Sequence, residues 1–362
     1  SMNNEIISEK YSIFFKKNGF YFLKNHIKKF DYSKIFIHVD NNTKEYCLEY
    51  FLKEISLEKF EIIESEDGEE NKNIESCLKL WDSISSAGGD RNSLLINLGG
   101  GVVTDMGGFI ASTYKRGINY VNIPTTLLSM VDASVGGKTG IDFGILKNQI
   151  GTFYDPQAVI VDPFFLNTLP ENQILSGYAE IFKHSVISKN QLFEDLVKLE
   201  RISFDLKTIY QSIQVKNKIV LVDKKESKER KSLNFGHTLG HAIESFFLNT
   251  NKKLLHGEAI SIGIILASYI SNKLFNFSKI NLKSIKSHLD KLYNKVEISD
   301  NEINGIIELL KHDKKNSHGN INFILIKEIG KPVYDIKVSN ELIRESFKYY
   351  LSWISTSVNI SK

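Results

Sequence analysis

Two imidazoles and one carboxylate stand in short segments that are typical of a catalytic metal site. His237 lies in NFGHTLGHAIE, His256 lies in HGE, and Glu180 lies in GYAEIFKH. Nitrogen and oxygen donors of this kind hold a catalytic zinc ion while one coordination position stays open. Cys47 and Cys77 are the only two cysteines, and they lack the Cys-x-x-Cys spacing of a structural zinc site. The trio therefore predicts metal-assisted chemistry on a small, oxygen-rich substrate.

A polar stripe is expected around His237, because five polar residues recur at helical spacing. They are Arg230, Asn234, His237, His241 and Glu244. A helix turns by about 100° per residue, so this spacing places all five on one narrow face of a single helix. Gly236 and Gly240 lie inside the same expected helix. Each costs up to ~1 kcal/mol relative to alanine, a cost that is accepted where a backbone must approach another group closely.

Glu180 has a second charged group beside it. Lys183 follows by one helical turn, so the ammonium and the carboxylate share a face. A surface ion pair is the simplest interpretation, but Ala179, Ile181 and Phe182 make the segment apolar. Buried charges pair or bind a metal, which favours placing both groups in the site.

Cations elsewhere in the chain predict an anionic substrate. Lys138 stands on a glycine-rich segment that we expect to be a loop between the two halves of the chain. Lys216 precedes Arg230 by fourteen residues, and Arg116 lies in the segment YKRG. Several cations in one region suggest a substrate with phosphate and carboxylate groups.

A glycine-rich turn, Gly99–Gly101, follows the expected strand Leu94–Leu98 and precedes the expected helix Val102–Ser112. A helix that begins after such a turn offers free N–H groups and its dipole to a phosphate. The segment matches neither the G-x-G-x-x-G nor the Walker pattern, so a simple tight turn is equally compatible with it. Asp40 and Thr125–Thr126 also follow strands, and open α/β sheets bind ligands at that edge. The residues at these neighbouring strand ends favour a nucleotide-binding site over a simple tight turn.

The elements that must position these residues fall into two halves of a 362-residue chain. Expected strands are Lys34–Val39, Phe60–Ile63, Leu94–Leu98, Ile118–Ile123 and Ala158–Val161, and the helices between them are Thr43–Glu54, Asn73–Ser86 and Val102–Ser112. Such alternation predicts a Rossmann-like α/β domain with a parallel sheet, over residues 1–172. Residues 173–362 are expected to form a mainly α-helical domain, with a ligand in the cleft between the two.

The second half has a longer list of expected elements. The helices are Ile174–Ile187, Leu206–Leu221, Leu233–Phe247, Ala259–Leu274, Glu302–Leu310 and Glu341–Ser355, with a hairpin of Ile321–Ile326 and Pro332–Tyr334. All three candidate metal ligands lie in this half.

Composition excludes several classes of protein. A net charge of +3 is too small to indicate a nucleic-acid partner. The longest apolar run, near Ile260–Ile270, is interrupted by Ser and Gly and is shorter than the ~20 residues of a membrane span. We expect no signal peptide, because the first residues are polar, and two cysteines fit a reducing compartment. The prediction is a cytoplasmic protein with a small-molecule partner and no membrane or nucleic-acid partner.

Seven longer segments, in the order given, resemble the 3-dehydroquinate synthase family of the sugar-phosphate cyclase superfamily. They are GGGVVTDMGGFIAS, YKRG, IPTTLLSMVDASVGGKTGID, LKNQIGTFYDP, SGYAEIFKH, LNFGHTLGHAIE and HGEAI, and the match runs from about Asp40 to Lys315. The resemblance implies conversion of 3-deoxy-D-arabino-heptulosonate 7-phosphate to 3-dehydroquinate and phosphate, in the shikimate pathway to aromatic amino acids. It also implies catalytic NAD, one divalent metal (zinc or cobalt) and a homodimer.

The resemblance also implies roles for individual residues. Glu180, His237 and His256 match the metal ligands. Positions that match the NAD site are Asp40, Asn42, Glu69, Lys72, Gly99, Gly100, Gly101, Val102, Asp105, Thr125, Thr126, Lys138 and Lys147. Positions that match substrate contacts are Asp132, Lys138, Asn148, Lys183, Lys216, Arg230, Asn234, His241, Arg116 and Lys314, or its neighbour Lys315. The implied catalytic groups are Lys138, Asn148, Lys183, Glu226 and His241, and Arg116 matches an arginine supplied across a dimer interface.

One segment departs from the family. An acidic residue and a glycine usually precede the arginine of the stripe, whereas here Lys224 replaces the acid and the glycine is missing. Glu226 still aligns with a carboxylate near the substrate, and we expect residues 223–230 to form an exposed connector.

Three alternatives stay open. A related cyclase, such as 2-deoxy-scyllo-inosose synthase acting on glucose 6-phosphate, shares much of the pattern but does not need to hold a substrate carboxylate. The joint presence of Arg230, Asn234 and His241 favours the heptulosonate over that substrate. A metal-dependent polyol dehydrogenase shares the glycine turn. A non-catalytic sugar-binding protein is disfavoured, because the chain keeps the full set of ligands and cations.

Overall fold

The computed structural model describes residues 5–202, 204–224, 226–316 and 321–352, which form two compact units. Unit 1 comprises Ser1–Gly177 together with Phe204–Leu221, and unit 2 comprises Tyr178–Ser203 together with Val222–Lys362. The chain passes from unit 1 to unit 2 within helix α6 (Glu171–Ile187).

The sequence predicts a domain boundary between residues 172 and 173, which would place helix α8 (Leu206–Val222) in the second domain. In the structure, residues 206–221 of this helix belong to unit 1. Two buried side chains bind α8 to unit 1. The amide Nδ2 of Asn217 donates to the carbonyl of Ile7 at 3.0 Å, and Nζ of Lys216 lies 2.7 Å from Oδ1 of Asp132. The chain therefore returns to the first unit after entering the second, which a single boundary cannot describe.

Unit 1 is built on a seven-stranded sheet with the strand order β1-β2-β9-β6-β5-β3-β4. Its strands are β1 (Glu5–Ile7), β2 (Ser12–Phe15), β3 (Lys34–Asp40), β4 (Glu61–Ser65), β5 (Ser93–Gly99), β6 (Asn119–Pro124) and β9 (Ala158–Val161). All neighbouring pairs are parallel except β1 and β2. The predicted α/β domain with a parallel sheet is confirmed, whereas the hairpin at its edge was not predicted.

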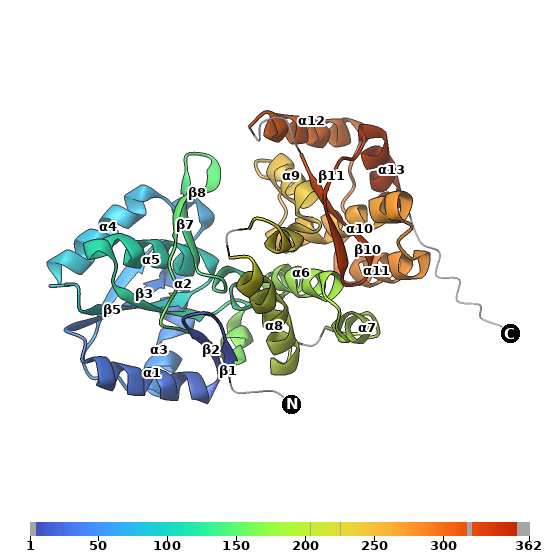
Figure 1. The fold of residues 1–362 in the computed structure, drawn as a ribbon. Coiled ribbons are helices and arrows are strands. Elements are labelled where there is room, and N and C mark those ends of the chain that lie inside the picture. Colours follow the sequence, from blue (N-terminus) through green and yellow to red (C-terminus); the bar gives the residue numbers. More distant parts are fainter. Residues whose placement is uncertain (1–4, 203, 225, 317–320, 353–362) are drawn as a thin grey trace. The chain divides into compact units, whose positions relative to one another are not determined.

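Helices cover both faces of this sheet. Helices α1 (Lys17–Phe30) and α3 (Leu48–Ile55) lie on one face, and α4 (Ile74–Ser86) and α5 (Gly101–Thr113) lie on the other (Figure 1). The single helix predicted over Thr43–Glu54 is wrong in one respect. It is divided at Cys47 into α2 (Asn41–Tyr46) and α3, and the Asp40 side chain caps the start of α2.

Strand β5 and helix α5 meet at the glycine turn. Every residue of β5 is buried, as expected for a central parallel strand. A Cβ at Gly107 would lie 1.9 Å from Oδ1 of Asn97 in β5, and a Cβ at Gly99 would lie 2.6 Å from Val103. The glycines therefore let α5 lie directly on the sheet and fix the position of its N-terminus.

The segment around Lys138 is a β-hairpin, so the prediction of a loop between two halves is wrong. Strand β7 (Lys138–Phe143) pairs antiparallel with β8 (Leu146–Phe153), and β7 packs against α5. Figure 1 shows the hairpin extending from the rest of unit 1. The first turn of the segment has positive φ at Gly136 (105°) and Gly137 (70°), a conformation that glycine adopts readily.

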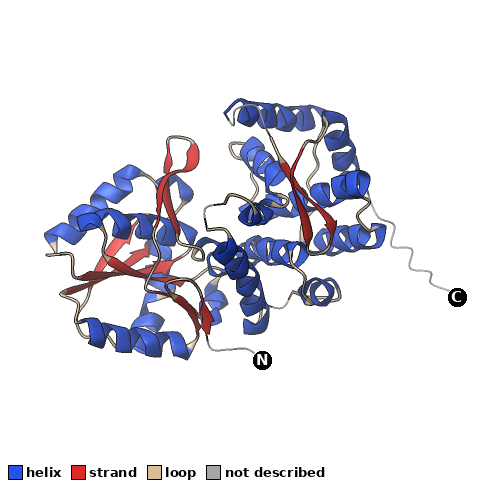
Figure 2. Cartoon of the chain, viewed as in Figure 1, coloured by secondary structure: helices blue, strands red, loops and turns tan. Residues whose placement is uncertain are grey.

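Unit 2 is mainly helical, as predicted, and Figure 2 shows strands among its helices. Besides the end of α6, its elements are α7 (Leu192–Val197), α9 (His237–Phe247), α10 (His256–Phe275), α11 (Lys279–Leu292), α12 (Asp300–Asn316), α13 (Asn340–Leu351), β10 (Phe323–Glu328) and β11 (Lys331–Ile336). Helix α10 is the core element, because it packs against α9, α11, α13 and β10. Within the described residues, no helix is both long and apolar enough to cross a membrane.

Candidate active site

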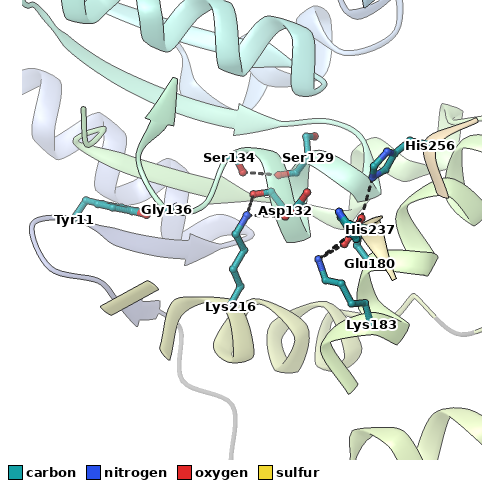
Figure 3. A network of polar contacts seen from close by, with 10 residues as sticks. All are labelled: Tyr11, Ser129, Asp132, Ser134, Gly136, Glu180, Lys183, Lys216, His237 and His256. Atoms are coloured by element: carbon teal, nitrogen blue, oxygen red, sulfur yellow. Dashed lines mark hydrogen bonds and ion pairs between the residues drawn. The ribbon is translucent and has the colours of Figure 1, made fainter. Parts of the chain in front are cut away.

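Glu180, His237 and His256 converge in unit 2 (Figure 3). Oε1 of Glu180 lies 3.1 Å from Nε2 of His237 and 3.0 Å from Nε2 of His256. Glu180 comes from α6, whereas His237 and His256 are the first residues of α9 and α10. Three helices thus direct one donor atom each to a common point.

The crossing of α9 and α10 brings the two histidines together. A Cβ at Gly263 in α10 would lie 2.0 Å from the carbonyl oxygen of Gly236 and 2.9 Å from the amide nitrogen of Gly240. The two helices therefore touch through backbone atoms, which only glycine permits. The glycines near His237 were predicted to allow a close approach, and the group that approaches is helix α10.

The prediction of one continuous helix for the polar stripe is wrong. A 3₁₀ helix, η5 (Glu229–Asn234), holds Arg230 and Asn234, and α9 begins only at His237. Between them, Gly236 has a φ of 75°, so the chain changes direction before His237. The break lets His237 open a helix, and it separates Arg230 from the face that carries His241 and Glu244.

The charges around Glu180 are balanced. Nζ of Lys183 is in contact with Oε2 of Glu180 and lies 3.5 Å from Nε2 of His237. Although burial opposes ionisation, Lys183 and His237 hold the pKa of the Glu180 carboxyl well below its usual range. Burial lowers the pKa of His237. Burial also disfavours a charged His256, but hydrogen bonds to Glu180 and Glu244 raise its pKa to about 10.

This donor set fits a divalent cation. Glu180 is fully buried, and the Nε2 atoms of His237 and His256 point at the same carboxylate oxygen. A buried carboxylate needs a paired charge or a metal ion, and carboxylate oxygens and imidazole nitrogens are the donors that a catalytic zinc ion uses. Among the described residues, His241 is not part of this donor group; its ring centroid lies 4.9 Å from that of His237.

A pocket of about 410 Å³ opens beside the trio within unit 2. Its lining includes His237, His241, Asn234, Glu226 and Lys231. A metal ligand thus borders a space large enough for a small polar molecule, and several of the predicted substrate-binding side chains face the same space.

The connector before Arg230 is held by one carboxylate. Ser227 and Lys228 are exposed, as expected for this connector, whereas Asp223 and Arg230 at its two ends are buried. Asp223 is 6% exposed and accepts hydrogen bonds from the backbone N–H groups of Ser227, Lys228 and Arg230. Although desolvation opposes it, these bonds hold the pKa of Asp223 well below its usual range. Lys228 occupies the loop with a negative φ of −148°, so the conformation does not depend on glycine there.

Arg230 is buried, and its Nη1 donates to the carbonyl of Lys224 at 2.6 Å. Nδ2 of Asn234 lies 3.5 Å from Oε1 of Glu226, so these two predicted residues are neighbours. Lys314 and Lys315 belong to α12, but their side chains lie outside the described residues.

In unit 1, the predicted nucleotide residues gather at the carboxyl ends of β3, β5 and β6. Helix α5 begins at Gly101 after Gly99 and Gly100, and Val102 occupies its first turn. The amide of Thr125 donates to the carbonyl of Gly99 at 2.9 Å, and Thr126 follows it. Asp40 caps α2 by accepting from the amide of Thr43, and Asn42 donates to Asp67. The helix N-terminus and the neighbouring strand ends form the arrangement that binds phosphate groups.

A cluster of charges joins the 3₁₀ helix η1 (Glu69–Asn71) and the adjacent Lys72 to α5 and the β7–β8 hairpin. Nζ of Lys72 is buried and lies 2.9 Å from Oδ2 of Asp105, 2.6 Å from Oδ1 of Asn148 and 3.8 Å from Oε1 of Glu69. Burial raises the pKa of Glu69 to about 7. Lys138 begins β7, and Lys147 precedes Asn148 in β8. One ammonium therefore connects residues predicted for the cofactor with a residue predicted for the substrate.

Three further predicted residues, Lys216, Asp132 and Arg116, lie elsewhere in unit 1. Figure 3 shows Lys216 of α8 directed at Asp132, where its Nζ contacts the carbonyl oxygen at 2.5 Å and Oδ1 at 2.7 Å. The same figure shows the phenol of Tyr11 at the amide of Gly136, 3.1 Å away. Arg116 ends the 3₁₀ helix η2 (Tyr114–Arg116) with a φ of 64°.

Three residues that shape these sites could not be assigned a role from the sequence. Glu244 lies 3.1 Å from Nδ1 of His256, Asp223 holds the loop before Arg230, and Oδ1 of Asp142 accepts from the amide of Asn148 at 2.8 Å. Glu244 was visible only as the end of the stripe. The role of Asp142 could not be recognised from the sequence. Its partner is the backbone amide of Asn148, six residues away, in a hairpin that was not predicted.

Comparisons with known proteins point to one family. The 3-dehydroquinate synthase N-terminal family matches residues 62–176, and the 3-dehydroquinate synthase C-terminal family matches residues 177–316. A 3-dehydroquinate synthase of Parabacteroides distasonis is 42% identical over 332 residues, which cover 91% of this chain and 94% of the relative.

Two solved structures share the fold. A 2-deoxy-scyllo-inosose synthase complexed with carbaglucose-6-phosphate, NAD⁺ and Co²⁺ has a TM-score of 0.80 at 24% identity, covering 94% of this chain and 96% of the other. The 2-epi-5-epi-valiolone synthase of Streptomyces hygroscopicus subsp. jinggangensis, with NAD⁺ and Zn²⁺ bound, has a TM-score of 0.82 at 24% identity, covering 97% and 99%.

Proposed function

This chain belongs to the 3-dehydroquinate synthase family and catalyses that family's reaction, and we propose that Glu180, His237 and His256 hold the divalent metal ion for it. The reaction converts 3-deoxy-D-arabino-heptulosonate 7-phosphate to 3-dehydroquinate and phosphate. The observation that carries the proposal is the convergence of the two Nε2 atoms on Oε1 of a fully buried carboxylate, at 3.1 and 3.0 Å.

The metal, zinc or cobalt, would act as a Lewis acid that polarises hydroxyl or carbonyl oxygens of the sugar. The pocket beside His237 is the place for that sugar, because it borders the trio and is lined by hydrogen-bonding groups. Asn234 and His241 orient hydroxyl groups there, and Arg230 binds the substrate carboxylate. Lys183 neutralises charge next to Glu180, since its ammonium is in contact with Oε2 of that residue.

The nucleotide site belongs to unit 1. In this proposal, the N-terminus of α5 binds the pyrophosphate of NAD together with Gly99, Gly100 and Gly101. Asp40 and Asn42 bind its ribose. NAD supplies a hydride acceptor that returns the hydride within each cycle. Lys72, Glu69, Thr125 and Thr126 would contribute to the same cofactor site.

The remaining predicted residues complete the substrate site. Lys138, Lys216 and either Lys314 or Lys315 are the proposed ligands of the phosphate group, and Asp132 holds Lys216 in place through its carboxylate at 2.7 Å. Asn148 and Glu226 are further catalytic groups of the proposal, and Arg116 contributes from the second subunit of a homodimer. These assignments rest on the match of each residue to the motifs of the family. The contacts that the residues make within each unit are compatible with these roles.

A phosphate-release assay with two sugars tests this function. We expect release from 3-deoxy-D-arabino-heptulosonate 7-phosphate and none from glucose 6-phosphate, with no net NADH because the hydride is returned. Turnover of glucose 6-phosphate alone would identify a different cyclase. Net NADH formation from a polyol, without phosphate release, would identify a dehydrogenase.

A further inference from the structure

His256 is held from both sides of its ring. Its Nε2 lies 3.0 Å from Oε1 of Glu180, and its Nδ1 lies 3.1 Å from Oε1 of Glu244. Glu244 is in α9, seven residues after His237, so two turns of the same helix carry a candidate metal ligand and this second carboxylate. The Glu244 side chain is only 12% exposed, so its carboxylate is largely withdrawn from water.

We propose that Glu244 is a positioning residue for His256, which fixes the ring so that Nε2 faces the metal and Nδ1 carries the proton. The inference rests on the metal site proposed above and extends it to a residue outside the trio.

The chemistry of imidazole gives the reason. A neutral ring has one N–H group and one lone pair, and only the nitrogen with the lone pair can bind a metal. A carboxylate beside Nδ1 accepts its N–H, which leaves the lone pair on Nε2. Histidine ligands are commonly held in this way, and removal of the outer partner typically weakens metal binding 10- to 100-fold.

The position of His256 makes such support necessary. It is the first residue of α10, where the chain has just left an extended Leu255, and its side chain is 26% exposed. A half-turn of the ring about its Cβ–Cγ bond would exchange Nδ1 with Cδ2 and Nε2 with Cε1, and would turn both nitrogens away from their carboxylates. Glu244 favours the present orientation because it accepts a hydrogen bond from Nδ1, and it favours the tautomer with the proton on Nδ1 because it repels a lone pair there.

Cobalt affinity tests the inference on the metal-depleted protein, without NAD or substrate. Dissociation constants for Co²⁺ are measured by competition with a chromophoric chelator for the unaltered protein, Glu244→Leu, Glu244→Ala and Glu244→Gln. We expect the Leu and Ala variants to bind Co²⁺ roughly 10- to 100-fold more weakly. Glutamine keeps an oxygen that accepts from Nδ1, so it should recover most of the affinity, to within roughly tenfold of the original.

The visible absorption of bound Co²⁺ gives a second readout, because it reports the ligands and their geometry. At saturating Co²⁺ we expect an altered spectrum for Glu244→Leu and an unaltered one for Glu244→Gln. Glu302→Ala is the matched control, since it removes a carboxylate of unit 2 whose partners are Lys252 and Ser299. It should leave both the affinity and the spectrum unchanged.

The possible outcomes distinguish a failure of this inference from a failure of the proposed metal site. If a folded Leu or Ala variant binds Co²⁺ as tightly as the unaltered protein, Glu244 does not position His256. The same conclusion follows if glutamine is as weak as leucine. If the unaltered protein and the control both fail to bind Co²⁺, the trio is not a metal site, and both the proposed function and this inference are wrong.

Discussion

Replacement of Glu180 by glutamine should lower kcat/KM for phosphate release by about 10³-fold or more. Glutamine has the same shape, so the change removes the charge and little else. A bound metal contributes several kcal/mol of charge stabilisation in the transition state, and each 1.4 kcal/mol corresponds to about tenfold in rate. The variant also leaves the buried ammonium of Lys183 without its carboxylate, because Lys183 is only 1% exposed and in contact with Glu180.

The measurement is the initial rate of phosphate release, with the metal content of each sample determined by plasma mass spectrometry. Circular dichroism confirms that the variant is folded. Glu194→Gln is the matched control, because Glu194 is an exposed carboxylate in α7 of the same unit. A folded Glu180→Gln protein that retains full activity would refute the assignment of the metal ligands.

Replacement of Gly263 by alanine should destabilise unit 2 by about 3 kcal/mol, near the upper end of the cost of overpacking a core. The added Cβ would lie 2.0 Å from the carbonyl oxygen of Gly236 and 2.9 Å from the amide nitrogen of Gly240. Both are backbone atoms, so no side-chain rotation can relieve the overlap. Helices α9 and α10 must move apart, and they carry His237 and His256.

Urea unfolding followed by circular dichroism measures the change in stability, and chelator competition measures Co²⁺ affinity in parallel. We expect both to fall in Gly263→Ala. Ser268→Ala is a control in the same helix, where the change removes an oxygen that bonds to the carbonyl of Ile264 and adds no atoms. An unchanged free energy of unfolding in Gly263→Ala would show that the glycine contact does not hold the two helices together.

The fold was predictable where local patterns are strong. Strands such as β5 and β9 are entirely buried, and their continuous apolar runs define the parallel sheet. The resemblance to the family is also confirmed by a relative at 42% identity. The short strands β1 and β2 escaped prediction, because runs of three and four residues carry too little periodicity.

Glycines caused the main errors around the site. Gly236 and Gly240 lie at helical spacing from their polar neighbours, so the sequence supports an uninterrupted helix. Gly236 has a positive φ, and its carbonyl lies against Gly263, twenty-seven residues away, a contact that no local pattern contains. The glycines near Lys138 caused a similar error. They precede and lie within a hairpin whose strands pair Gly140 with Gly151, and this pairing is not visible in the local sequence.

The candidate metal ligands were easier to predict than the residues that hold the site in place. The metal trio could be identified from residue chemistry, because histidine and carboxylate have few other roles in an apolar setting. The carboxylates that act through another residue were not identified. Glu244 and Asp223 are recognisable only by what they contact, namely the Nδ1 atom of His256 and the backbone amides before Arg230.

Metal dependence of phosphate release tests the account most directly. Protein depleted with a chelator and checked by plasma mass spectrometry is supplied with NAD and 3-deoxy-D-arabino-heptulosonate 7-phosphate, and Co²⁺ is then titrated in. The account predicts that phosphate release falls to background after depletion and returns in full at about one equivalent of Co²⁺ per chain, as a single metal site requires. An undiminished rate in the metal-free protein would contradict it.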